Sequence, residues 1–303
     1  MALYGRNASK RQRYRCKACH RTYVWKVPYN RKLRLQHWFR LWIRESCSIR
    51  LLCKLSGYSK FKLNGIKDYW LSHFPEEPPD YTKIKYMVYD ATYFHKEGCL
   101  ISLMNAANQN IIASIYVKKE SFKNAYPWFM SLKSQGLDPG FITTDGERSI
   151  LRAMKLVWPG AKLQRCLYHL QHEGMRWLRT HPKTEAGAAL RKLLSSLSAI
   201  KTFTEKDHFI DEYKYWINRY KSYVSSLPQT LLAFKDLKRT MALVNNALPD
   251  MFYFLEDANV HSTTNALEGF HSRLKADYRR HRGFSREHKV QFLKWYCYFE
   301  NIN

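Results

Sequence analysis

The chain has 303 residues and a formal net charge of +26, because 51 Lys and Arg side chains face only 25 Asp and Glu side chains. Such an excess predicts a phosphate-rich partner, with a ribosome-associated basic protein as the alternative interpretation. Seven cysteines without disulfide-framework spacing, and no apolar run near the roughly 18 residues of a membrane span, predict a cytoplasmic protein with no membrane partner.

The positive charge is concentrated near the N-terminus. Residues 1–80 carry 18 Lys or Arg against 5 Asp or Glu, a net charge of +13. This distribution predicts a DNA-binding arm followed by a more balanced body. Within the arm, residues 1–30, Cys16 and Cys19 form a single Cys-x-x-Cys pair, half of a zinc ribbon. The arginines beside this pair that we expect to contact DNA are Arg11, Arg13 and Arg15.

Residues 31–75 show a helical pattern. Apolar residues at helical spacing predict one helix over residues 31–45, and shorter helices follow over residues 48–55 and 59–73. Gly57 lies in the turn before the third helix, so the layout is that of a helix-turn-helix module, with an ordinary three-helix packing unit as the alternative. The residues of the third helix that suit a DNA groove are Lys60, Lys62, Asn64 and Lys67.

The pattern changes after an acidic, proline-rich linker over residues 76–83. Three short apolar runs predict antiparallel strands, and two strand–helix repeats follow. This order predicts an α/β fold with an RNase H-like core, a mixed five-stranded sheet with flanking helices. The expected divisions are residues 84–169 for the first part of the core, 170–258 for an all-helical insertion, and 259–303 for the core's C-terminal helices.

Three carboxylates are candidates for metal-dependent chemistry. We expect Asp90 and Asp145 each to end an apolar strand, and Glu268 lies on a predicted helix. Alone, such an Asp is most often a turn former and such a Glu a solvated residue. Together they can hold two Mg²⁺ or Mn²⁺ ions that clamp the attacking and leaving oxygens of a phosphodiester displacement. Asn265 and Lys275 share a helix face with Glu268, where Lys275 can reach a phosphate.

Several short motifs surround these carboxylates. They are Asp90-Ala91-Thr92-Tyr93, Asp145-Gly146, Trp158-Pro159-Gly160-Ala161, Gln164-Arg165-Cys166 with His169, and Thr263-Thr264-Asn265-Ala266-Leu267-Glu268 with Leu274-Lys275. Together they resemble the Mutator-type (MULE-like) DDE transposases of bacterial insertion sequences. The resemblance covers roughly residues 84–285. It implies that Asp90, Asp145 and Glu268 are the catalytic residues and Mg²⁺ ligands, with a helical insertion between the last two.

Two cysteine motifs are less specific. Cys166 and His169 lie three residues apart at the start of a predicted helix, and together they supply only half of the ligands of a zinc site. The main interpretation is a packing or hydrogen-bonding role beside the active site. The alternative is a metal contact. The family subgroup that Cys16 and Cys19 resemble carries a second Cys-x-x-Cys upstream, which this sequence lacks. We therefore expect a truncated ribbon and doubt that it holds Zn²⁺.

The resemblance implies a transposase that binds the terminal inverted repeats of an insertion sequence in double-stranded DNA. It would cleave and transfer strands as a homodimer or larger oligomer, associated with the bacterial nucleoid. Two alternatives remain: a transposase-derived DNA-binding protein that no longer cleaves, and an RNase H-like nuclease without strand transfer. Metal-dependent nicking separates the enzymes from the binder, and strand-transfer products separate the transposase from the nuclease.

Overall fold

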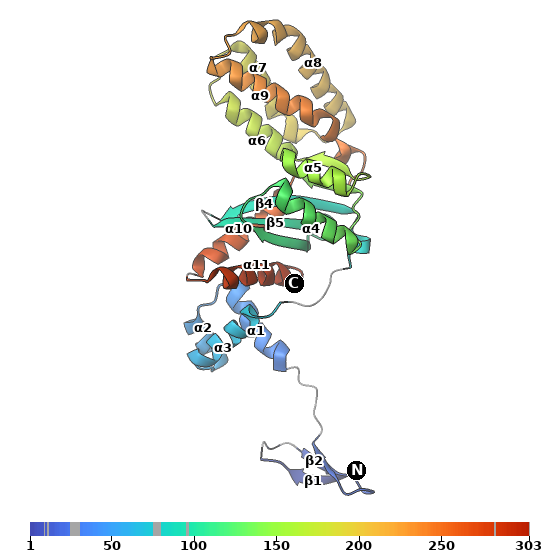
Figure 1. The fold of residues 1–303 in the computed structure, drawn as a ribbon, viewed down its shortest axis with the longest axis vertical. Coiled ribbons are helices and arrows are strands. Elements are labelled where there is room, and N and C mark those ends of the chain that lie inside the picture. Colours follow the sequence, from blue (N-terminus) through green and yellow to red (C-terminus); the bar gives the residue numbers. More distant parts are fainter. Residues whose placement is uncertain are drawn as a thin grey trace. The chain divides into compact units, whose positions relative to one another are not determined.

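The computed structural model describes residues 1–303 apart from residues 9, 11, 25–30, 75–79, 95–96, 282 and 303, and apart from the side chains of residues 31–34. The expected DNA contact Arg11 and half of the expected linker, residues 76–79, therefore lie outside the described residues. The chain divides into two compact units, Met1–His73 and Phe74–Asn303 (Figure 1). Among the described residues, no helix is long and apolar enough to cross a membrane.

The first unit begins with a small antiparallel sheet, where the sequence predicted only a basic arm. Its strands, in spatial order, are β1 (Ala2–Arg6), β2 (Gln12–Arg15) and β3 (Thr22–Val24). The guanidinium groups of Arg13 and Arg15 lie 5.4 and 5.2 Å from the ring centre of Tyr4. No residue of these strands is fully buried. The apolar alternation that usually marks a strand is therefore missing.

Three helices follow: α1 (Arg31–Arg44), α2 (Ile49–Ser56) and α3 (Lys60–Leu71). Serine hydroxyls cap two of them, because Ser48 accepts a hydrogen bond from the N–H of Leu51 and Ser59 accepts one from the N–H of Lys62. Gly57 ends α2 in the left-handed conformation, with a φ of 69°. The three helices bury a shared apolar core of Phe39, Ile43, Leu52, Leu63 and Ile66.

The second unit is built on one mixed sheet, which follows the short helix η1 (Tyr81–Lys83). The strands are β4 (Tyr86–Phe94), β5 (Gly98–Asn105), β6 (Ile111–Val117), β7 (Phe141–Thr144) and β8 (Lys162–Arg165), in the spatial order β6-β5-β4-β7-β8. The first three strands are antiparallel neighbours, and β7 and β8 run parallel to β4. This order, with the first strand in the centre, confirms the predicted RNase H-like core.

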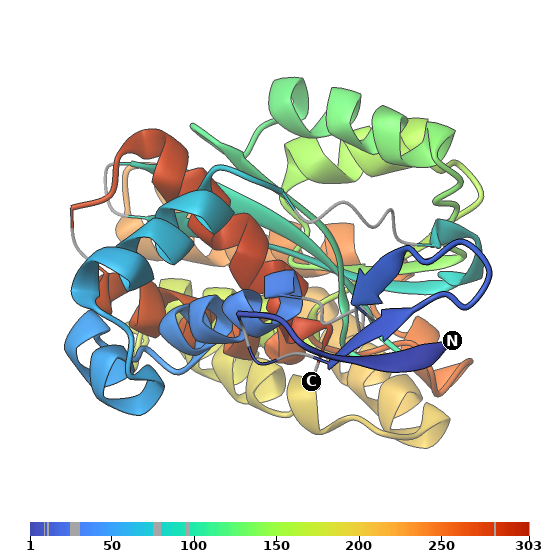
Figure 2. The same ribbon diagram turned by 90° about the horizontal axis from the view of Figure 1, so that it is seen from below.

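Helices cover both faces of the sheet. They are α4 (Phe122–Ser134), α5 (Arg148–Val157), α10 (Asn265–Arg280) and α11 (Arg286–Glu300). Figure 2 shows α4 and α5, in green, stacked on one side of the strands, where Tyr89 of β4 meets Phe129 of α4. Successive side chains of a strand point to opposite faces, so Asp90 faces α10 on the other side.

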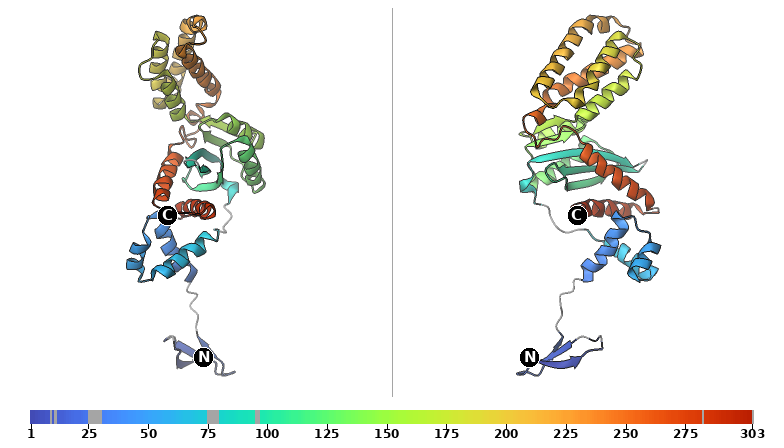
Figure 3. Two further views of the ribbon diagram at one scale, coloured as in Figure 1. Left: turned by 60° about the vertical axis from the view of Figure 1, so that its left-hand side comes forward. Right: turned by 180° about the vertical axis from the view of Figure 1, so that it is seen from behind.

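The helical insertion has its own core. Its helices are α6 (Leu167–Leu178), α7 (Glu185–Ser195), α8 (Phe203–Ser226) and α9 (Leu232–Ala247), with short turns η2 (Leu197–Ala199), η3 (Leu248–Asp250) and η4 (Tyr253–Leu255). They pack as a bundle (Figure 3) around buried side chains such as Leu190, Tyr213 and Trp216. Residues 170–258 are all described and contain no strand. Because α6 begins directly after β8, the bundle is joined to the edge of the sheet.

Candidate active site

Asp90 lies within β4, not at its end as the sequence suggested. The strand continues to Phe94 because residues 91–94 still pair with β5. On the other side, however, β7 pairs with β4 only as far as Val88. The edge of β4 at Asp90 is therefore open toward the loop that follows β7, and Asp145 begins that loop.

A buried histidine holds Asp90 in place. His271 of α10 is 2% exposed, and its Nδ1 lies 2.9 Å from Oδ2 of Asp90. Its Nε2 is hydrogen bonded to the hydroxyl of Ser102, also at 2.9 Å. Ser102 pairs directly with Asp90 across β4 and β5. No sequence motif singles out His271, although its position three residues after Glu268 places both side chains on neighbouring parts of one helix face.

Asp145 lies in a tight turn that fixes the position of its carboxylate. Its Oδ1 accepts a hydrogen bond of 3.2 Å from the N–H of Glu147. Burial raises the pKa of Asp145, and the negative charge of Asp90 raises it further. Gly146 has a φ of 90°, and a Cβ atom there would overlap the guanidinium group of Arg165. Arg165 in turn donates from Nη2 to the carbonyl of Asp145 at 3.3 Å.

We predict that Gly146→Ala destabilises the chain by about 1–3 kcal/mol, because the side chain adds backbone strain and displaces Arg165. Urea denaturation measures this free energy of unfolding. Gly160→Ala is the matched control, since nothing lies within 4 Å of its Cβ position and it should change stability by less than about 0.5 kcal/mol. Equal effects of the two substitutions would contradict this explanation of the turn.

Glu268 lies in the first turn of α10, and two hydrogen bonds fix the segment that leads into that helix. Thr143 Oγ1 donates to the carbonyl of His261 at 2.8 Å, and the N–H of Leu167 donates to the carbonyl of Ser262 at 2.9 Å. Thr264 Oγ1 then donates to Oε1 of Glu268 at 2.7 Å. These bonds tie the helix start to β7 and to the end of β8, the strands nearest to Asp145.

Cys166 and His169 lie directly beside Glu268. His169 Nδ1 is 3.2 Å from Cys166 Sγ and 3.6 Å from Oε1 of Glu268. The hydrogen bond with Cys166 raises the pKa of His169 to about 9, and the charges of Cys166, Glu268 and Asp145 act in the same direction. The ligand atoms of Cys166, His169 and Glu268 all lie within 4.8 Å of one another. The structure thus brings this predicted pair next to the third carboxylate.

Glu120 is a fourth acidic residue at the site. It precedes α4, and its Oε1 accepts a hydrogen bond of 2.7 Å from the hydroxyl of Tyr89. Burial raises the pKa of Glu120 to about 7, and the charges of Asp145, Glu147 and Asp90 add to this shift. Glu120 could not be predicted from its neighbours, because it follows two lysines in a segment with the pattern of a polar turn.

The two other expected supporting residues are placed differently. Lys275 is half-buried on α10, where burial lowers its pKa and the charge of Asp90 partly opposes that shift. The ammonium group of Lys275 therefore interacts electrostatically with the carboxylate of Asp90. Asn265 is the first residue of α10 and is exposed, three residues before Glu268.

The carboxylates suit a divalent cation. Carboxylate oxygens are the ligands that Mg²⁺ prefers, and Asp90 and Asp145 come from adjacent elements of a rigid sheet. Burial, and to a smaller extent the charge of Asp90, raises the pKa of Asp145, and a cation bound there would favour the ionised carboxylate. The donor chemistry of Asp90 and Asp145 therefore fits Mg²⁺ or Mn²⁺.

The candidate DNA-binding residues lie in the first unit. Lys60 and Lys62 are exposed on α3, and the ammonium of Lys62 lies 3.6 Å from the ring centre of Tyr58. Asn64 and Lys67 are half-buried on the same helix, and Lys67 is paired with Asp68 at 3.3 Å. In the small sheet, Arg15 donates to the carbonyl of His20 at 3.2 Å.

The Cys16–Cys19 turn has the local form of a metal knuckle. Hydrogen bonds from the backbone of Cys19 and Ala18 lower the pKa of Cys16. Across the part of the chain that the structure describes, however, the one grouping of three metal-type ligands is the Cys166, His169 and Glu268 cluster. The knuckle therefore supplies two of the four ligands that a structural zinc site needs.

We predict that the purified chain holds less than about one equivalent of tightly bound zinc, because two thiolates do not complete a tetrahedral site. Elemental analysis of the wild type, Cys16→Ser and Cys166→Ser checks this. Stoichiometric zinc that is lost in Cys16→Ser would show that the small sheet has further ligands. Zinc that is lost only in Cys166→Ser would place the metal beside Glu268.

One family model matches part of the chain. Residues 86–173 match the family model of the MULE transposase domain, a segment that contains Asp90, Asp145, Cys166 and His169. No curated protein matches the chain. Among solved structures, 77 chains match. One belongs to the intasome of simian T-cell lymphotropic virus in complex with the PP2A regulatory subunit B56 gamma, with 11% identity and a TM-score of 0.23 over 55% of this chain and 70% of that chain. The fold assignment rests on the strand order given above.

Proposed function

We propose that the chain is a DDE transposase of an insertion sequence. The match of residues 86–173 to the family model of the MULE transposase domain supports this proposal. In this proposal it binds the terminal inverted repeats of the element, cleaves DNA with divalent metal and transfers the freed strand to target DNA. The observation that carries the proposal is the contact of Asp90 on β4 with His271 of α10, the helix whose first turn holds Glu268, beside the loop after β7 that begins with Asp145.

Asp90, Asp145 and Glu268 would hold the metal ions, which when bound supply Lewis-acid activation of water and of the scissile phosphate. The remaining residues fix these ligands. His271 orients Asp90 through its Nδ1, and Ser102 holds the ring of His271 through its Nε2. Thr264 orients Glu268 by donating a hydrogen bond to its carboxylate. Such supporting hydrogen bonds set the ligand geometry and so the metal affinity.

The net charge of +26 supports double-stranded DNA as the partner. The exposed lysines of α3 and the arginines of the small sheet are proposed to contact its phosphates and grooves. Strand transfer needs both ends of an element in one complex, so the proposal includes a homodimer or larger assembly on DNA.

The direct test uses DNA from the flanks of the element that encodes this chain. With Mg²⁺, we expect nicks at the element boundary that leave 3′-hydroxyl groups, followed by joining of these ends to a second DNA. Nicking without joining would contradict strand transfer and would favour the alternative of a hydrolytic nuclease. DNA binding without nicking, in the presence of Mg²⁺ or Mn²⁺, would favour the alternative of a transposase-derived DNA-binding protein.

We predict that His271→Ala raises the Mg²⁺ concentration needed for half-maximal nicking by about 10- to 100-fold, because Asp90 loses its orienting partner. His271→Gln should recover part of the loss by keeping one hydrogen bond. Calorimetric Mn²⁺ binding without DNA provides a readout independent of activity. His208→Ala, on the exposed side of α8, is the control. An unchanged Mn²⁺ affinity in His271→Ala would remove His271 from this role.

A further inference from the structure

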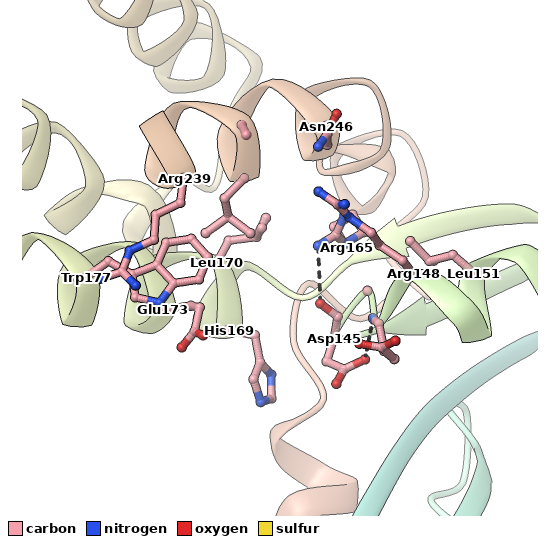
Figure 4. A pocket seen from close by; sticks show the side chains of 14 residues that line it. Asp145, Arg148, Leu151, Arg165, His169, Leu170, Glu173, Trp177, Arg239 and Asn246 are labelled. Carbon is pink, nitrogen blue, oxygen red and sulfur yellow. Dashed lines mark hydrogen bonds between the residues drawn. The ribbon is translucent and has the colours of Figure 1, made fainter. Parts of the chain in front are cut away.

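A cavity of about 880 Å³ opens between the sheet and the helical insertion, directly beside Asp145. Figure 4 shows its two walls. Asp145, Arg148 and Arg165 line it from the core, and Trp177 and Arg239 line it from α6 and α9. Its volume is within the range of about 300–1,000 Å³ that is usual for small-molecule sites.

The core wall offers cationic groups to an anion. Arg165 is only 6% exposed, and within the described residues its Nε has no hydrogen-bond partner. A buried guanidinium donor without a partner is costly and indicates a missing ligand. Arg148, the first residue of α5, is exposed at the same wall. Guanidinium groups match phosphate oxygens well because they present several donors in one plane.

The insertion wall carries the indole ring of Trp177. The guanidinium carbon of Arg239 lies 4.9 Å from the ring centre of Trp177. Arg239 is anchored there, because its Nη2 donates to Oδ1 of the buried Asp236 at 2.6 Å. Leu170 and Leu243 add apolar surface between this wall and Asp145. The surface suits a planar aromatic ring, which stacks on indole and guanidinium planes.

A nucleotide carries a planar base and a phosphate on one sugar, so we propose that this cavity binds an unpaired nucleotide of the DNA next to the cleaved phosphate. The assignment rests on the proposed function, which brings that phosphate to Asp145. Trp177 is eight residues after His169 on α6, about 12 Å along the helix, which is a few nucleotides of DNA. A base that leaves the duplex stack would then lie on Trp177 with its phosphate toward Arg165 and Arg148.

The test uses the full chain and two labelled probes, a blunt duplex and the same duplex with a short single-stranded extension that carries 2-aminopurine at its first unpaired position. The wild type should bind the extended probe more tightly and quench the 2-aminopurine. Trp177→Ala should lower this preference by about 5- to 150-fold and abolish the quenching, because one base–aromatic stack is lost. Trp177→Phe should keep much of both.

Tyr215→Ala is the matched control, since it removes an exposed aromatic ring from α8 that does not line the cavity. Circular dichroism and melting temperature confirm that each variant is folded. Equal binding of the two probes by the wild type, or unchanged preference and quenching in folded Trp177→Ala, would overturn the assignment. A loss in Tyr215→Ala equal to that in Trp177→Ala would also overturn it.

Metal-dependent nicking is measured on the same preparations, so that a failure of the proposed catalysis can be distinguished from a failure of the proposed nucleotide site. If the wild type never nicks DNA but its quenching depends on Trp177, the cavity binds the nucleotide and the proposed catalysis is wrong. If the wild type nicks DNA and Trp177→Ala changes neither readout, the catalysis stands and the cavity assignment is wrong.

Discussion

Asp90→Ala, Asp145→Ala and Glu268→Ala should each reduce metal-dependent nicking by about 10³-fold or more, while the affinity for DNA stays within about twofold of the wild type. Each substitution removes one metal ligand, and a bound metal contributes several kcal/mol to transition-state stabilisation, at about 1.4 kcal/mol for each tenfold in rate. Removing a negative charge cannot weaken phosphate contacts made by Lys and Arg side chains.

Gel-based nicking assays and fluorescence anisotropy measure the two quantities on the same preparations. Asp207→Ala, which removes an exposed carboxylate from α8, is the control and should cleave normally. A variant at Asp90, Asp145 or Glu268 that cleaves at nearly the wild-type rate would take that residue out of the site. Glu120→Gln belongs in the same series, because its carboxylate shares the electrostatic environment of Asp145 and Asp90.

The DNA affinity of the full chain should fall steeply with salt. If about six phosphates are contacted, the slope of log affinity against log salt is about −5, and the affinity falls about 10³-fold between about 50 and 200 mM salt. The cause is the release of counterions from DNA when Lys and Arg side chains neutralise its phosphates. Fluorescence anisotropy over a salt series gives the slope.

The double variant Lys60→Ala/Lys62→Ala should make this slope shallower by about 1 for each lost phosphate contact. Lys214→Ala/Lys221→Ala is the matched control, because it removes two exposed lysines from α8. If the α8 pair changes the slope and the α3 pair does not, DNA recognition lies in the helical insertion. A slope near zero would contradict an electrostatic mode of binding altogether.

Much of the core could be predicted because its signals are local. The strand around Val88 begins with a continuous apolar run over residues 86–89, which is typical of a strand buried on both faces. The turn at Gly57 and the cap at Ser59 mark the start of α3 in the sequence itself. The strand order then follows from the sequence of antiparallel and strand–helix segments, and the sheet has that order.

The site could be predicted only in part, because its contacts join residues far apart in the chain. His271 and Ser102 are 169 positions apart, and their hydrogen bond exists only once α10 packs on the sheet. Asp90 was expected at a strand end, but pairing with β5 carries β4 on to Phe94. The small sheet of residues 2–24 lacks apolar alternation and so left no pattern to detect.

The central claim is that Asp90, Asp145 and Glu268 bind the catalytic metal. Crystals of the chain grown with Mn²⁺ test it most directly, because anomalous scattering locates the ion without any assumption about activity. We predict a manganese peak within about 2.0–2.6 Å of carboxylate oxygens from both Asp90 and Asp145. A peak found only at Cys166 and His169, or no peak near these carboxylates at saturating Mn²⁺, would contradict the claim.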